Sequence, residues 1–268
     1  MASSFAAMSE SRRTGYVIPL LAAVLLLLVV GDRLWRLRPR SAPPATPAGI
    51  DRPPAAPATD LGNVPAGRPP VSPLAGGGAA RQAVRERLRQ EGAGTYLPEI
   101  LAENDSVLRR WPARAGRTLR VAVVRLDAEG YVESFAGAVS WAVTRWNGVG
   151  LPVQLETGAD SAGADIVVAW VDSLGAGRLG RAEVTWDGKG EVVRVALALA
   201  THAPDGTPLS QRLMVTLALH ELGHALGLGH SSDRADALFP TSTATELTPR
   251  DRRTATLLYD LPTGSLKN

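Results

Sequence analysis

Apolar and polar positions alternate in patterns that divide the second half of the chain into short strands and two helices. Apolar runs of strand length, rich in β-branched residues, lie at 119–124, 153–155, 164–171, 182–186 and 192–199. The run 164–171 is almost continuously apolar, which predicts a strand buried on both faces. Apolar residues at a helical period predict one helix from Ser134 to Trp146 and a second from about Ser210, its N-cap, to Leu226.

The N-terminal part of the chain has a different pattern. Residues 15–31 are uncharged and nearly all apolar, and arginines flank them on both sides. A helix of that length spans about 25 Å at roughly 1.5 Å per residue, close to the ~30 Å hydrocarbon core of a bilayer. We therefore predict a transmembrane anchor at 15–35. A cleaved signal peptide is the alternative, although residues 32–36 offer no small-residue cleavage site.

A proline-rich segment follows the apolar run. Ten of the twenty prolines lie between Pro43 and Pro73, mixed with Ala, Gly and Thr. Such a composition stays extended and cannot bury a core, so it predicts a disordered linker. The next segment is either a helical arm or a propeptide-like segment. We divide the chain into a short polar N-terminal segment (1–14), the anchor or signal (15–35), the linker (36–78), the helical or propeptide-like segment (79–110) and the main domain (111–268).

Charge is distributed unevenly along the chain. The sequence pI of about 9.7 would suit a nucleic-acid-binding protein. However, residues 1–110 hold 14 Lys and Arg against 9 Asp and Glu, whereas residues 111–268 hold 15 against 17. The basic excess belongs to the N-terminal extension, so we expect no nucleic-acid partner. Cysteine is absent, which excludes disulfides and thiolate zinc sites.

The stretch HELGHALGLGH carries the chemistry of the chain. His220 and His224 are four residues apart on the predicted helix, so both imidazoles project from one face. That spacing suits two nitrogen ligands of one zinc ion, with Glu221 beside them as a candidate general base. Gly227 can adopt the left-handed conformation that ends the helix and lets His230 return as a third ligand. Three protein ligands and an open position are typical of catalytic zinc.

The extended pattern HExxHxxGxxH resembles that of the metzincin zinc peptidases, and Ser231 after the third histidine resembles the matrixin branch. Residues 237–240 (ALFP) occupy the place of the family's Met-turn, with Leu238 where methionine is expected. The family's methionine packs beneath the zinc without binding it, a role that leucine can fill. Residues 247–259 are similar to the matrixin C-terminal helix, and the resemblance covers residues 108 to 262.

The resemblance implies an α+β (α/β-like) fold with a twisted, mostly parallel sheet and an antiparallel edge strand. The sheet would pack against the active-site helix and a second long helix, with a further helix at the C-terminus. The implied activity is zinc-dependent endopeptidase cleavage of peptide or protein substrates. His220, His224 and His230 would bind one catalytic Zn²⁺, and Glu221 would be the general base. An extended substrate would pair with an edge strand, which we place at 192–199.

Other ligand candidates are weaker. His202, the one histidine outside the motif, is expected in a solvated loop, so we predict a single zinc. The acidic residues Asp187, Glu191 and Asp205 lie in predicted turns without the spacing of a calcium loop, so Ca²⁺ has no support.

A second functional hypothesis is a zinc-containing, membrane-bound peptide-binding module with weak or no catalysis. Two departures from the family motivate it: Leu238 in place of methionine, and the absence of the propeptide cysteine that holds many matrixins latent by binding the zinc. The intact Glu221 favours a peptidase. By resemblance we expect the catalytic domain outside the cytoplasm, or secreted if the anchor is cleaved. The arginines that follow the anchor favour the opposite orientation. The Ala-, Arg- and Pro-rich composition is typical of a GC-rich bacterial genome.

Overall fold

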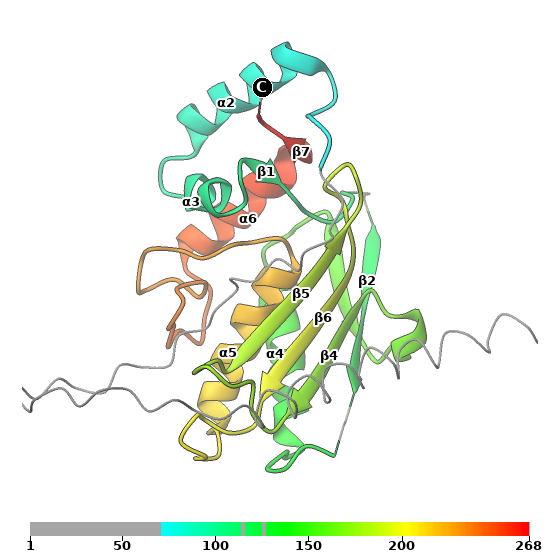
Figure 1. Cartoon of the computed structure of the whole chain (residues 1–268), viewed down its shortest axis with the longest axis vertical. Helices are drawn as coiled ribbons and strands as arrows, with labels where there is room; N and C mark the ends of the chain where they lie inside the picture. The colour runs from blue at the N-terminus through cyan, green and yellow to red at the C-terminus, as the bar shows by residue number, and fades with distance from the viewer. Residues whose placement is uncertain (1–70, 114–115, 125–126, 268) are drawn as a thin grey trace, which may run out of the picture. The chain divides into compact units, whose positions relative to one another are not determined.

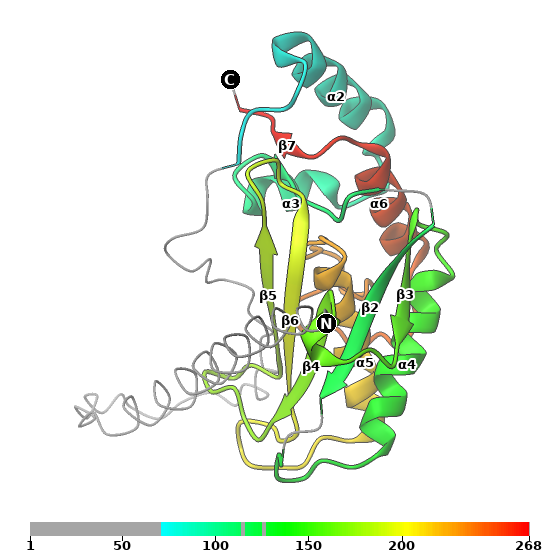
Figure 2. The ribbon, with the colours of Figure 1, turned by 90° about the vertical axis from the view of Figure 1, so that its right-hand side faces the viewer.

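Five strands form one mixed sheet, and the two long helices lie against one of its faces (Figures 1 and 2). The computed structural model describes residues 71–267 apart from 114–115 and 125–126. Across the sheet the order is β3 (Val153–Thr157), β2 (Arg117–Val124), β4 (Ile166–Val171), β6 (Val192–Ala200) and β5 (Gly180–Trp186). The first four of these strands are parallel to one another, and β5 is antiparallel to β6, as the resemblance implies.

The edges of the sheet are β3 and β5, so the prediction that residues 192–199 form the substrate-binding edge is wrong. Strand β6 pairs with β4 on one side and with β5 on the other, and it has no open edge. The side chains explain the order: β6 is almost wholly apolar, whereas β5 carries Arg181, Glu183 and Thr185 at alternate positions. Charged side chains are typical of strands at an edge.

Strand β4 is buried on one face only, contrary to the expectation from its continuous apolar run. Ile166, Val168 and Trp170 are buried, whereas the three residues that alternate with them are half-buried. Both long helices lie on the same side of the sheet, so the second face has no helical layer in the described part of the chain (Figure 2). The apolar run in β4 is continuous because Val167, Ala169 and Val171 on that half-buried face are also apolar, although no second layer of helices from the described residues covers them.

The two long helices are α4 (Ser134–Asn147) and α5 (Gln211–Ala225), close to their predicted bounds. The Ser210 hydroxyl accepts a hydrogen bond from the backbone N–H of Leu213, so the predicted N-cap is confirmed. The indole of Trp146 donates to the backbone carbonyl of Leu219 at 2.9 Å and joins α4 to α5. The C-terminal helix α6 (Pro249–Asp260) begins with a capping box formed by Thr248 and Asp251.

Residues 71–111 pack on the same domain. They form α2 (Gly77–Glu91), α3 (Leu97–Glu103) and β1 (Val107–Leu108), which pairs with β7 (Gly264–Ser265). We call residues 95–111, which include α3, the N-terminal arm. Its side chains Tyr96, Leu97, Ile100 and Trp111 are at most 1% exposed and belong to the core shared with the sheet and α5. A short helix η1 (Ser161–Gly163) precedes β4.

Within residues 71–267, no helix is both long and apolar enough to cross a membrane. The anchor or signal predicted at 15–35 and the segment 1–14 lie outside the described residues, as does most of the predicted linker. The last part of that linker already contacts the domain, because the backbone N–H of Leu74 donates to the Ser265 carbonyl at 3.0 Å.

Candidate metal centre

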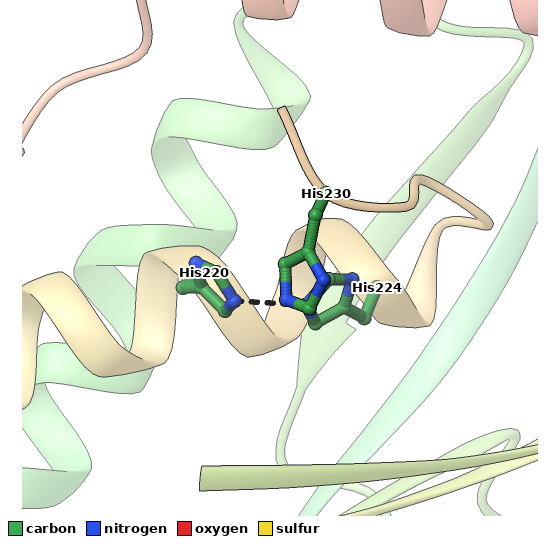
Figure 3. Close-up of side chains that lie close together, drawn as sticks. All are labelled: His220, His224 and His230. Atoms are coloured by element: carbon green, nitrogen blue, oxygen red, sulfur yellow. Dashed lines mark hydrogen bonds between the residues drawn. The ribbon is translucent and has the colours of Figure 1, made fainter. Parts of the chain in front are cut away.

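Three histidines converge at the C-terminal end of α5 (Figure 3). His220 and His224 lie one helical turn apart, and His230 approaches them from the loop that follows the helix. One ligand atom from each residue lies within 4.8 Å of the other two. In the described part of the chain, this is the one group of three or more His, Cys, Asp or Glu residues that could hold a metal ion. The structure thus brings together the three ligands predicted from the motif.

Each of the three rings has a hydrogen-bond acceptor at its Nδ1 atom. A carbonyl or an ionised carboxylate can only accept, so each such bond places the proton on Nδ1 and leaves the Nε2 lone pair free. The contacts are His220 Nδ1 to Ala237 O at 2.8 Å, His224 Nδ1 to Leu228 O at 2.8 Å and His230 Nδ1 to Glu103 Oε1 at 3.3 Å.

The free Nε2 atoms therefore face a common point. The Nε2 atoms of His220 and His224 are 2.8 Å apart, and Nε2 of His230 is buried without a hydrogen-bond partner among the described residues. Two lone pairs that face each other at this distance repel unless a cation lies between them. The donor set and its orientation fit a zinc ion held by three neutral imidazoles.

Burial keeps the imidazoles of His220 and His224 neutral. Desolvation, with a smaller contribution from the charge of His230, lowers the pKa of His220 to about 3. Desolvation, followed by the neighbouring histidines, also lowers the pKa of His224 well below its ordinary value. Both rings are therefore in the metal-binding form at neutral pH.

The turn after α5 has the conformation predicted from the sequence. Gly227 has a φ of +99°, and a Cβ at this position would lie 2.5 Å from the carbonyl oxygen of Arg109. The last carbonyl groups of the helix are hydrogen-bonded by side chains from distant parts of the chain: Trp111 Nε1 donates to Ala225 O at 2.7 Å and Tyr259 OH donates to Leu226 O at 3.1 Å. The direction in which the chain returns to His230 is thereby fixed.

Leu238 lies at the place expected for the Met-turn methionine. It is fully buried, and its side chain packs on α5 at Gly223, between the turns that carry His220 and His224. The preceding residue, Ala237, accepts the hydrogen bond from the His220 ring and donates its own N–H to Asp251 Oδ2 at 3.0 Å. The turn therefore supports the ring of His220 through a hydrogen bond to Ala237.

Gly223 has no space for a side chain, so Gly223→Ala should destabilise the protein and weaken metal binding. A Cβ at this position would lie 2.8 Å from Leu238 Cδ2 and 2.9 Å from Trp146 Cζ2. We expect a loss of about 1–3 kcal/mol in the free energy of unfolding, measured by urea denaturation. Gly137→Ala in α4 is the matched control, because a Cβ there meets no atom within 4 Å. Equal stability of the two variants would contradict the packing described.

Among the described residues, Glu221 is the one carboxyl group whose oxygens are buried without a hydrogen-bond partner. It is 0% exposed, and neither carboxylate oxygen has a hydrogen-bond partner among the described residues. Desolvation raises its pKa to about 8. The carboxylate lies against β5, where a Cβ added to Gly180 would be 2.5 Å from Glu221 Cδ. A buried carboxyl without partners is costly to the fold and marks a functional group.

The other ligand candidates have local partners. The ring of His202 lies against Gly130, with Nδ1 2.9 Å from Thr201 Oγ1, and His202 is not part of the metal group. Asp187 accepts the backbone N–H of Glu191 at 3.0 Å, and Asp205 accepts that of Thr207 at 2.9 Å. These carboxylates stabilise turns.

The sheet with its antiparallel edge, the helix that carries two histidines and the third histidine beyond its end define a zinc-peptidase catalytic domain of the metzincin type. A comparison with protein families matches residues 117–260 to Matrixin. The chain belongs to the matrixin family of zinc metalloendopeptidases. The catalytic zinc follows from the family and from the histidine triad. No curated protein matches the chain significantly.

Proposed function

We propose that His220, His224 and His230 hold the catalytic zinc through Nε2 and that Glu221 is the general base of peptide-bond hydrolysis. The observation that carries this proposal is the arrangement of the ring nitrogens. All three Nδ1 atoms have acceptors, the Nε2 atoms of His220 and His224 are 2.8 Å apart, and Nε2 of His230 is buried without a hydrogen-bond partner among the described residues. Three ligands leave an open position, which a catalytic site requires and a structural zinc site lacks.

Zinc at such a site supplies a Lewis acid for the scissile carbonyl and acidifies the attacking water. Glu221 accepts the proton from that water and can then donate it to the leaving amine. Its unpartnered oxygens suit this role, because no hydrogen bond within the described chain has to break before the proton moves. Burial also raises its pKa to about 8, which makes the carboxylate a stronger base than an exposed one.

The substrate would extend the sheet at β5. Glu221 lies against the first residue of this strand, Gly180, so a peptide paired with the open edge would pass beside the general base. Main-chain hydrogen bonds along the edge would bind an extended peptide of varied sequence. We therefore propose that β5, and not the segment 192–199, pairs with the substrate.

The test is cleavage of a mixed peptide library by the full-length chain, with and without a zinc chelator. We expect internal cleavage that stops on chelation and resumes when zinc is restored. Zinc binding without any cleavage would instead support the peptide-binding module, whose motivation is Leu238 in place of methionine.

We also propose that the apolar residues 15–31 tether the enzyme to a membrane, with the catalytic domain outside the cytoplasm. The support is the length and apolarity of this run and the proline-rich segment after it. The full-length chain should then sediment with membranes and be released by detergent but not by salt. A chain found in the soluble fraction with a new N-terminus after residue 31 would show a cleaved signal instead.

A further inference from the structure

The third metal ligand has a contact that the other two lack. His220 and His224 donate from Nδ1 to main-chain carbonyls within the region matched to the family. His230 instead faces the carboxylate of Glu103, which lies on the N-terminal arm and before residue 117, where the family match begins. We propose that Glu103 is a positioning residue that orients the third metal ligand and makes the arm a part of the metal site. This inference rests on the proposed role of His230 in zinc binding.

The carboxylate contacts His230 at two atoms. Oε2 accepts the backbone N–H at 3.1 Å and Oε1 lies 3.3 Å from Nδ1 of the ring. One rigid group thus restrains both the backbone and the side chain of the ligand. The ring is turned so that Nε2 points inward, where it is buried. Carboxylate partners of this kind fix the tautomer of a metal-binding histidine and raise its basicity.

The close packing of α3 on the loop supports the same conclusion. A Cβ added to Gly229, the residue before the ligand, would lie 2.6 Å from Glu103 Oε2 and 3.2 Å from Ile100 Cγ1. Because Gly229 has no side chain, the helix can approach the loop closely enough for the carboxylate to reach the ligand. Ile100 is fully buried at this contact and holds the helix in place.

A second acidic residue of α3 contacts the same loop but no metal ligand. Glu99 lies one turn before Glu103. Its carboxylate accepts the backbone N–H of Ser232 at 2.8 Å and pairs with Arg250 at 2.7 Å. Arg250 also pairs with the buried Asp236 at 2.6 Å. Glu99 therefore shares the docking role of the arm, and only Glu103 adds contact with a ligand. The two residues form a matched pair for a test.

The experiment measures the zinc Kd of the full-length chain by chelator competition, together with the visible absorption of the cobalt-substituted protein. We expect Glu103→Ala to weaken zinc binding by about 10–100-fold, as loss of such a partner does at other sites. Glu103→Gln, which keeps one acceptor oxygen, should fall between Glu103→Ala and the wild type. The cobalt spectrum should change in Glu103→Ala, whereas Glu99→Ala should keep both the zinc Kd and the spectrum near those of the wild type.

Urea denaturation of the metal-free variants shows whether each one folds, and Glu103→Gln replaces Glu103→Ala if the latter does not. An unchanged zinc Kd in the folded Glu103 variants would overturn the inference. So would an equal loss of affinity in Glu99→Ala, because docking of the arm alone would then explain both results. A wild-type chain that binds no zinc would contradict the proposed function itself.

Discussion

Replacing Glu221 with glutamine should abolish peptide cleavage and leave zinc bound. Glutamine has nearly the same size and cannot accept the proton of the attacking water, so the proton transfer loses its base. General acid–base groups contribute about 10²–10⁴-fold to rate, and we expect a loss of that order in kcat/KM. Glu221 is not part of the group of three residues that could hold the metal, so the zinc content of the variant should equal that of the wild type.

The control for this substitution is Glu246→Gln. Glu246 pairs with Arg145 at the surface and has no contact with the histidines, so turnover should not change. Turnover of Glu221→Gln within tenfold of the wild type would exclude Glu221 as the base. Loss of zinc from this variant would show that the carboxylate has a structural role at the site.

Replacing His224 with alanine should remove zinc and cleavage together. Its ring is fully buried between the other two histidines, which lie within 5.0 Å of it between ring centroids. Loss of a ligand should cost more than the ~10–100-fold in affinity that follows loss of an outer hydrogen-bond partner. Metal analysis and chelator competition measure the zinc affinity, and the peptide assay measures the activity.

His202→Ala is the matched control for the ligand variant, because His202 is the remaining histidine of the sequence. It should keep one zinc per chain and full activity. Wild-type zinc affinity in His224→Ala, or loss of zinc in His202→Ala, would mean that a different set of donors binds the metal.

Much of the candidate site could be predicted from sequence because its parts are local. The i, i+4 spacing of His220 and His224 requires only a helix, and the return of His230 requires only a left-handed residue at Gly227. The N-cap at Ser210 depends on the three residues that follow it. The resemblance to the matrixins added the sheet with its antiparallel edge strand and the position of Leu238.

The features that sequence analysis missed depend on contacts between distant residues. Glu103 meets His230 across 127 positions, and no periodicity in residues 79–110 indicates such a contact. Gly180 ends a turn-rich stretch, and nothing in the sequence indicates that it packs against Glu221. The sheet edge was misplaced for the same reason, because strand order is set by pairing between segments that are each apolar enough to form strands.

The most direct test of the account is a crystal structure of the zinc-loaded, full-length chain with anomalous scattering measured at the zinc absorption edge. We expect one zinc per chain, bound to Nε2 of His220, His224 and His230, with no fourth ligand from the protein. A zinc ion bound elsewhere, or a fourth protein ligand that closes the site, would contradict it.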